Sequence, residues 1–455
     1  PLLGVHLLQA PVLVLELFEP LHHRGIHAAE LRAPLVERRA ADAVLAAEVL
    51  NLAAAIGFFQ NRDDLILTQL GRFHCHFLYH IRSIMAEVSV YDLPAIRGSL
   101  RMHYITSVEI PAVNAQSVQI YSNAVVMADQ IPKFQLVTPY NRGNAQNDDI
   151  WWRKIETIFP RGRFKYIEFA LRAYLLLRRH AKIIYTRDIL IAFIFGLAGC
   201  SVVYEAHQRP SLKAKLLLRF LMPKDLYVVT ISNALKIYFI AELGIPEHRL
   251  HVAHDGVFLD RYKAAGPADL RAEFGIPDEQ RVLLHTGSLY PGRGAELFSC
   301  VLKRYPDLSI VHIGGDAANI DYWKSKIASP RFYGKPHVDA QSLIRYQKGA
   351  DYLFYPMTRN AKTYWCCSPM KVFEYMAAAK PIISTNIGAI AEVMSENNAY
   401  LFDPDCNTSL FAAIDDCLND DKQAEMKAAK AFSDVEKNFT WDDRVKGIRC
   451  FVGLL

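Results

Sequence analysis

Short apolar runs alternate with longer amphipathic segments along most of this chain, from about residue 101 onward. Apolar runs of strand length are followed by stretches in which apolar residues recur at helical spacing. The expected strands are 102–107, 134–139, 182–186, 201–207, 226–232 and 250–256 in a first series. A second series comprises 282–287, 308–316, 331–334, 351–356 and 382–383. Strands that alternate with helices imply parallel sheets of Rossmann type, so the predicted fold class is α/β.

The alternation breaks once, at residues 262–279, which have the character of a linker with one helix. The pattern therefore predicts two Rossmann-like domains in tandem, at residues 99–262 and 263–435, facing each other across a cleft. Residues 436–455 are a candidate closing helix with Trp441 as its anchor. At 455 residues the chain is too long for one ordinary hydrophobic core, which agrees with this division.

Residues 1–98 differ from the rest. Between residues 1 and 84 there is no Lys, Met or Trp, while Arg and His each occur seven times. No strand-helix alternation is visible, so we expect an N-terminal extension outside the functional part of the chain, such as an upstream reading frame translated by mistake or a fused fragment. His76 and His80 lie four apart on a possible helix here, but two ligands without supporting carboxylates are a weak zinc signal.

Composition narrows the class of protein. A hydrophobic fraction of 51% and a charged fraction of 22% are typical of a globular chain. Eight cysteines without Cys-x-x-Cys pairing fit a reducing cytoplasm, and no secretory signal is visible. The longest apolar run, 189–203, falls short of a membrane span and is better explained by a helix followed by a buried strand.

Positive charge is concentrated between residues 151 and 220, where fourteen Lys and Arg face four Asp and Glu, a local net charge of +10. Two helices carry much of it, at residues 165–180 and 211–222. Such a face suits an anionic membrane surface or a lipid-linked phosphate; an ordinary solvated helix face explains it equally well. Nucleic acid is the least favoured partner, because aromatic residues are not interleaved at base-stacking spacing.

The most informative stretch is 366–394, CCSPMKVFEYMAAAKPIISTNIGAIAEVM. Ser368 is expected to cap a helix whose first position is Pro369. Lys371 and Glu374, three apart, share the face opposite the apolar one, near the positive end of the helix dipole. A helix start with a lysine beside a strand end suits a phosphate-bearing ligand; a buried helix with a solvated Lys/Glu pair is the alternative.

Three further segments are predicted to point into the cleft. HTGSLYPGRG (285–294) follows a strand, so its glycines permit close approach of a phosphate that Arg293 can neutralise. Glu205 and His207 are expected just past the end of a buried strand, where ligand-binding groups collect, although a lone histidine is as often structural. The turn in 252–262 is interpreted as mainly architectural, with Gly256 free to take a positive φ.

Together these segments resemble the family 4 retaining glycosyltransferases of GT-B fold, the glycosyl transferases group 1, over residues 102–455. The stretch 368–393 is similar to the family's donor-binding helix and the loop after it. HTGSLYPGRG looks like the first strand-loop of the donor domain, HDGVFLDRY (254–262) like the inter-domain turn, and IPAVNAQS (110–117) like the loop after the first strand.

The resemblance implies roles for individual residues. Lys371 and Arg293 would hold the donor diphosphate, and with His207, beside the transferring sugar, they form the catalytic set. Glu374 would bond the ribose hydroxyls. Ser288, Ser368 and Gly388 would complete the donor site. Gly388 belongs to the segment 387–389, which would help to enclose the nucleotide. Asn114, Gln116 and Ser117 would form the acceptor-side loop.

The chain departs from the family pattern at three positions. Cys366 stands where many members have a glutamate that contacts the donor sugar. Ser288 stands where an arginine frequently supports the diphosphate, and Ala379 replaces a helix-ending glycine. These changes leave the donor sugar undefined.

The expected function is a metal-independent, cofactor-free retaining transfer from a UDP- or GDP-sugar to a glycan or lipid-linked acceptor. Surface polysaccharide, lipopolysaccharide or glycolipid synthesis is the expected setting, at the inner face of the membrane. Cations and helix N-terminal amides would stabilise the leaving diphosphate in place of a metal. Two alternatives keep the fold: an epimerase or hydrolase using Glu205 or Glu109 as acid/base, or a non-catalytic binding partner.

Overall fold

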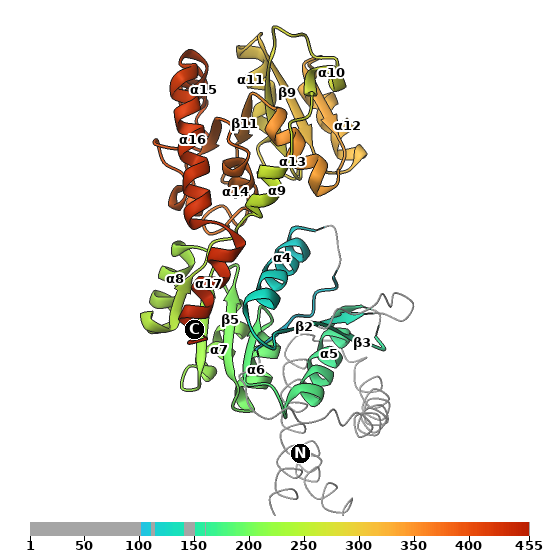
Figure 1. Ribbon diagram of the computed structural model, residues 1–455, viewed down its shortest axis with the longest axis vertical. Helices are drawn as coiled ribbons and strands as arrows, with labels where there is room; N and C mark the ends of the chain where they lie inside the picture. The colour runs from blue at the N-terminus through green and yellow to red at the C-terminus, as the bar shows by residue number, and fades with distance from the viewer. Residues whose placement is uncertain (1–101, 111–113, 141–150, 160, 455) are drawn as a thin grey trace, which may run out of the picture. The chain divides into compact units, whose positions relative to one another are not determined.

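The computed structural model describes residues 102–110, 114–140, 151–159 and 161–454, all within one unit of the chain that begins at residue 88. Residues 1–98, with the proposed extension and the His76/His80 pair, lie outside the described residues. Two parallel β-sheets organise the described part, each with helices packed along its strands (Figure 1). The predicted α/β class is confirmed.

The first sheet has seven strands in the order β3-β2-β1-β4-β5-β6-β7, all paired in parallel. Its strands are β1 (Met102–Ile105), β2 (Gln135–Tyr140), β3 (Trp152–Glu156), β4 (Ile183–Thr186), β5 (Ser201–Ala206), β6 (Leu226–Thr230) and β7 (Leu250–Val252). The connecting helices are α4 (Ala115–Gln130), α5 (Gly162–Leu177), α6 (Ile189–Leu197), α7 (Leu212–Leu221) and α8 (Asn233–Leu243). The order reverses between β1 and β4, and at such a switch point the loops after the two strands diverge and leave room for a ligand.

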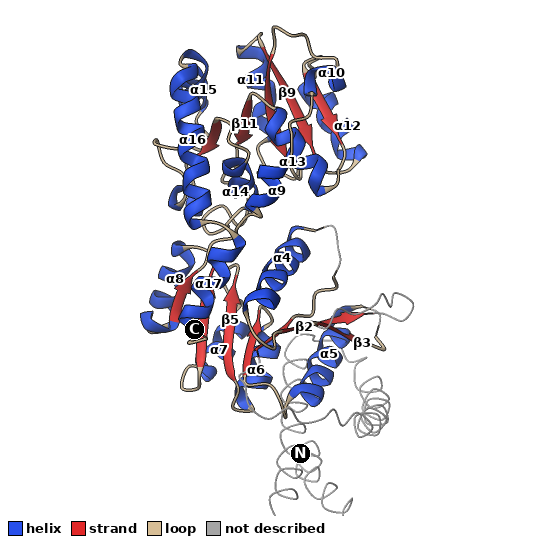
Figure 2. Cartoon of the chain, viewed as in Figure 1, coloured by secondary structure: helices blue, strands red, loops and turns tan. Residues whose placement is uncertain are grey.

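The second sheet has six strands in the order β10-β9-β8-β11-β12-β13, again all parallel. They are β8 (Arg281–Thr286), β9 (Leu308–Ile313), β10 (Phe332–Lys335), β11 (Tyr352–Tyr355), β12 (Ile382–Thr385) and β13 (Tyr400–Phe402). Its helices include α11 (Phe298–Arg304), α12 (Ala317–Ile327), α13 (Ala340–Gly349), α14 (Met370–Ala377), α15 (Asn407–Asn419) and α16 (Asp421–Asn438). Here the switch point lies between β8 and β11. Figure 2 shows the alternation of strand and helix in both sheets.

Each sheet is buried on both faces, which explains why its strands read as continuous apolar runs. Neighbouring residues of one strand enter different cores: Val203 packs with the cluster that includes α4, and Val202 with the cluster that includes α7 and α8. The second sheet likewise separates two clusters, one with Val282 and one with Leu283. The apolar run 189–203 is α6 followed by β5, as expected. No helix among the described residues combines the length and the hydropathy that crossing a bilayer requires.

The connection between the sheets contains two short helices, α9 (Leu259–Ala264) and α10 (Leu270–Phe274), where the sequence suggested one. Edge strands β3 and β13 and helices α15 and α16 were not predicted. The segment after Gly388 is a 3₁₀ helix, Gly388–Glu392.

The last helix, α17 (Trp441–Phe451), returns to the first sheet. Thr440 and Asp443 form a capping box at its start. Just before the helix, Thr440 forms an isolated β-bridge with Val257, which lies between the first and second sheets in sequence. Trp441, Val445 and Ile448 then enter the core that contains β1 and α4. Residues distant in sequence are thereby brought to the end of β5.

Candidate active site

Helix α14 presents Lys371 and Glu374 beside the carboxyl ends of β8 and β11. Its apolar face, with Val372, Phe373 and Met376, is buried as predicted. The predicted cap is wrong: the helix begins at Met370, and the N-cap is Pro369, which has no capping side chain. The Ser368 hydroxyl instead accepts a hydrogen bond from the backbone N–H of Asp255, at 2.9 Å, so it is occupied by the first domain's last loop.

Lys371 packs directly over Gly287, the first residue after β8. Gly287 has a φ of +112°, a conformation that residues with a Cβ rarely adopt, and a Cβ there would also displace the Lys371 ammonium. Burial, and next the nearby Arg293 guanidinium, lower the Lys371 pKa to about 8. The site therefore holds a lysine whose charge is poorly solvated.

Arg293 lies in the loop between β8 and α11, and its side chain hydrogen-bonds Tyr355 at the end of β11. Within the described residues, neither Arg293 nor Lys371 forms an ion pair with a carboxylate. Ser288 follows Gly287 in this loop and is half-buried. The backbone N–H groups of Gly292 and Gly294 already donate to the Glu296 carboxylate, at 2.9 and 3.1 Å. The cations, rather than those two amides, are therefore the groups that an anion would meet.

Glu374 is held one helical turn from Lys371. Its Oε2 accepts from Gln347 Nε2 at 3.1 Å, and Gln347 Oε1 accepts from the Tyr262 hydroxyl at 2.6 Å. Burial raises the Glu374 pKa against the opposing effects of Gln347 and Lys371. One carboxylate oxygen thus remains for a hydroxyl-bearing ligand.

Gly388, predicted in the nucleotide enclosure, has a φ of +52°, and a Cβ there would overlap the Tyr364 carbonyl. The 3₁₀ helix that it starts is therefore held against the loop preceding α14. Packing against Tyr364 therefore requires a glycine at this position, independently of any contact with a ligand.

Two buried histidines under the loop were not predicted. His285 and His312 lie at the ends of β8 and β9, with their Nδ1 atoms 2.8 Å apart. His312 Nε2 lies 3.1 Å from the Gly314 carbonyl and donates to it, so His285 carries the proton between the two Nδ1 atoms. Burial lowers the pKa of both rings, that of His312 to about 4. They support the loop as neutral groups.

The predicted acceptor-side residues have different environments. Asn114 caps α4 by accepting from the Ser117 N–H at 2.8 Å, and Asn114 and Gln116 are exposed. Ser117 is buried, and its hydroxyl reaches the Glu109 carbonyl at 3.4 Å. Asn114 therefore has a clear structural role, and α4 starts two residues earlier than expected.

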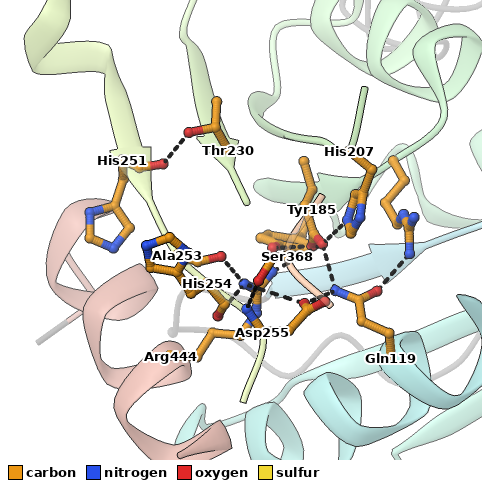
Figure 3. Close-up of polar contacts among 12 residues, drawn as sticks. Gln119, Tyr185, His207, Thr230, His251, Ala253, His254, Asp255, Ser368 and Arg444 are labelled. Atoms are coloured by element: carbon orange, nitrogen blue, oxygen red, sulfur yellow. Dashed lines mark hydrogen bonds and ion pairs between the residues drawn. The ribbon is translucent and has the colours of Figure 1, made fainter. Parts of the chain in front are cut away.

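Glu205 and His207 are at the end of β5, but Glu205 lies inside the strand and is fully buried rather than past its end. Figure 3 shows the polar contacts of this region, with Gln119, Tyr185, His207 and Arg444 labelled. The Glu205 carboxylate accepts from Arg444 Nη2 at 3.0 Å, Gln119 Nε2 at 2.9 Å, the Tyr185 hydroxyl and His207 Nε2. Arg444, Gln119 and Tyr185 come from α17, α4 and β4, and no sequence motif marks these three residues.

Further bonds hold this network in place. Arg444 also donates to the carbonyls of Ala253 and His254, the latter at 2.8 Å. Arg187 donates to Gln119 Oε1 at 2.6 Å, which orients the Gln119 amide so that its Nε2 reaches both Glu205 and Asp255. The bond from Asp255 N–H to Ser368 then links the network to the start of α14.

Cys366 does not lie at a solvent-facing sugar position. It is 1% exposed and packs in the core of the first domain that includes Leu235 and Phe239, while its carbonyl accepts from the Ser232 hydroxyl at 3.0 Å. Burial raises the thiol's pKa to about 12. Cys366 thus serves as an apolar contact between the loop before α14 and the first domain.

No group of three or more His, Cys, Asp or Glu suited to a metal ion occurs in the described ranges. One Asp-x-Asp triplet, 403–405, follows β13, where Asp405 Oδ2 lies 3.4 Å from Arg359 Nη1. Metal independence remains a prediction.

Two parallel-sheet domains, with cationic and polar residues gathered at their carboxyl strand ends, define the GT-B class of glycosyltransferase fold. Residues 280–420 match the model of the family described as glycosyl transferases group 1. The resemblance to group 1 glycosyltransferases and the fold, both expected from the sequence, are therefore confirmed.

Individual proteins that are similar to this chain include several glycosyltransferases. The chain is 27% identical over 238 residues to YtcC of Bacillus subtilis (strain 168), a protein whose glycosyltransferase activity is inferred; the match covers 48% of this chain and 58% of YtcC. Sucrose-phosphate synthase from Thermosynechococcus elongatus is similar in structure, with a TM-score of 0.64 and 16% identity over 78% of this chain and 98% of that one. The structure of Anabaena Alr3699/HepE in complex with UDP is also similar, with a TM-score of 0.63 and 15% identity; the match covers 78% of this chain and 100% of that one. WaaG, a glycosyltransferase involved in lipopolysaccharide biosynthesis, has a TM-score of 0.58 and 13% identity; the match covers 77% of this chain and 100% of WaaG.

Proposed function

We propose that this protein is a retaining, metal-independent glycosyltransferase that transfers a sugar from a UDP- or GDP-sugar to a glycan or lipid-linked acceptor. The observation that carries the proposal is the pair of neighbouring cations, Lys371 over Gly287 and Arg293 beside it, neither of which forms an ion pair with a carboxylate among the described residues. Positive charges that repel each other in a poorly solvated site are stabilised by an anionic ligand.

The neighbouring groups suit the rest of a nucleotide sugar. Glu374, one turn along α14, offers a carboxylate oxygen for ribose hydroxyls. Alr3699/HepE, which shares the fold, was solved with UDP and with UDP-glucose. During transfer, negative charge grows on the leaving diphosphate, and Lys371 and Arg293 would stabilise it there.

The epimerase or hydrolase alternative loses its main candidate. Glu205 accepts four hydrogen bonds, one from a buried arginine, so it has no free oxygen with which to exchange a proton with a sugar. Glu109 pairs with Lys165. Transfer to an acceptor remains the best-supported chemistry.

A thermal-shift panel of UDP, GDP and their sugars tests the donor site. We expect one nucleotide series to raise the Tm of the full chain, and Lys371→Ala and Glu374→Ala each to remove most of that rise. Lys380→Ala, beyond the end of the same helix, is the matched control and should retain it. Stabilisation by none of the ligands would contradict the donor site, and stabilisation that survives both substitutions would move it elsewhere.

The acceptor is proposed to come from an anionic membrane surface, in surface polysaccharide or glycolipid synthesis like that of WaaG. Helix α7 exposes Leu212, Leu216 and Phe220 on successive turns, with exposed fractions of 74%, 59% and 57%. Lys213 and Arg219 lie among them and are exposed. A helix face that combines large apolar side chains with cations suits an anionic bilayer interface better than water. Helix α5 suits it less well, since its Lys165 is buried.

Vesicle flotation tests this surface. Vesicles with anionic lipid should carry the wild-type protein upward, and Leu216→Glu with Phe220→Glu should abolish this. Met426→Glu, which changes an equally exposed apolar residue on α16, is the control and should float like the wild type. Equal recovery with neutral and anionic vesicles would contradict docking through charge.

A further inference from the structure

The network around Glu205 assigns roles to residues that no motif marks. Arg444, on the last helix, and Glu205, in β5, have side chains that are 1% and 0% exposed. Glu205 contacts the ring of His207, which is 19% exposed and lies at the carboxyl end of β5, near the switch point of the first sheet. Arg444 and Glu205 are too buried to touch a ligand, whereas His207 is accessible.

We propose that Arg444 and Glu205 are positioning residues that act through His207, holding its ring so that Nε2 donates to Glu205 and Nδ1 is left as the free acceptor. Only the catalytic role of this arrangement rests on the proposed function, because that function places His207 beside the transferring sugar. An imidazole fixed in this way can accept a hydrogen bond from a sugar hydroxyl.

Hydrogen-bond chemistry gives the direction. An ionised carboxylate only accepts hydrogen bonds, so the ring nitrogen that faces Glu205 must carry a proton. The arginine makes the ionised form of Glu205 possible: a carboxylate without exposure would protonate if no cation were paired with it. Gln119 and Tyr185 donate to the same carboxylate and leave His207 one fixed direction of approach.

The charges around the ring fix its protonation state. Burial would raise the Glu205 pKa, but the Arg444 guanidinium, followed by His207 and Arg187, holds it well below its usual range. Burial lowers the His207 pKa, and the Arg187 guanidinium on β4's outgoing loop lowers it further. Glu205 and Asp255 oppose this. At neutral pH the pair is thus a carboxylate and a neutral imidazole.

The two substitutions should shift the His207 pKa in the same direction. Without the carboxylate, in Glu205→Gln, the imidazolium loses a partner and the His207 pKa should fall. Without the guanidinium, in Arg444→Met, the buried Glu205 takes up a proton and loses its charge, so the His207 pKa should fall as well. We expect changes of about one pH unit in each case. A residue that only stabilises the fold would leave the His207 pKa unchanged in a variant that still folds.

The experiment is an NMR titration of the full-length protein with ¹³C-labelled histidine, with the His207 signal assigned from His207→Gln. The control is Lys446→Met on α17, whose exposed side chain lies outside the network; it should leave the His207 pKa unchanged. A rise of the His207 pKa in Arg444→Met, or no change in Glu205→Gln, would overturn the proposal.

Two further measurements cover a failure of Arg444→Met to fold and separate this inference from the proposed function. Arg444→Lys keeps the charge and should leave the His207 pKa near the wild-type value; a change as large as that in Glu205→Gln would count against Arg444 as the charge partner. UDP binding, measured by calorimetry, should be unaffected in Glu205→Gln. If wild-type protein binds neither UDP nor GDP, the proposed function fails while the histidine titration still decides the inference.

Discussion

Buried charges gather at the carboxyl ends of both sheets, and the two groups are balanced in different ways. Around Glu205, one carboxylate meets one guanidinium and three further donors, and the charges cancel. Around Gly287, Lys371 and Arg293 share a site in which the described residues supply no ion pair. A balanced group holds the fold and positions its neighbours, whereas an unbalanced one is completed by a ligand.

Removing one charge from each group should have opposite effects on stability. Arg444→Met leaves Glu205 buried without its cation and should destabilise the protein by about 3–5 kcal/mol. Lys371→Met removes a poorly solvated charge whose pKa is lowered to about 8, and should stabilise the ligand-free protein by about 1–3 kcal/mol at pH 7. Urea unfolding measures both, with Lys446→Met as the neutral control. Comparable destabilisation by the two substitutions would show that both groups are structural.

The pH dependence of donor binding tests whether the charges around Gly287 are completed by a ligand, unlike those around Glu205. With its pKa lowered to about 8, Lys371 is charged below pH 8 and neutral above it in the ligand-free protein. A bound diphosphate favours the charged form, so binding above pH 8 requires proton uptake, and affinity should fall by up to about tenfold per pH unit.

Calorimetry with UDP from pH 6.5 to 9.5, in two buffers of different ionisation enthalpy, measures both the affinity and the proton uptake. Lys371→Met should bind weakly with no such dependence. An affinity that stays constant through pH 9 in the wild type would place the phosphate away from Lys371.

The smallest expected effect concerns the end of α14, away from both groups of charges. Ala379 has a φ of +54°, a left-handed conformation that costs an L-residue about 1 kcal/mol. Ala379→Gly relieves this but adds freedom to the unfolded chain, so we expect a net stabilisation below about 1 kcal/mol. Ala378→Gly, at a right-handed helical position, should instead destabilise. Urea unfolding compares the two, and a loss of stability in Ala379→Gly would contradict the argument.

The sequence predicted the fold well because strands buried on both faces carry continuous apolar runs. It failed where that signal is absent. β3 is an edge strand with charged residues at Arg153, Lys154 and Glu156, and β13 has only three residues. Both were missed because an edge strand needs fewer apolar residues and a short one leaves no periodicity to detect.

The site divides in a similar way. Lys371 and Glu374 were recognisable because they lie on one face of a single helix. Gln119, Arg187 and Arg444 were not, because each is a lone polar residue in its own segment and only the tertiary fold makes them converge on Glu205. The cap at Ser368 was predicted from local pattern alone, and the wrong result follows from a distant group, the Asp255 N–H, that takes the same hydroxyl.

The return of α17 to the first sheet bears on the order of biosynthesis. A ribosome makes β5 and its Glu205 some 240 residues before it makes Arg444. Until α17 has emerged, the nascent first domain holds a carboxylate without its cation, so its folding is completed only after the whole second sheet has been made. A chain cut short before Arg444 would retain every strand of both sheets and still lack the residue that completes the first domain.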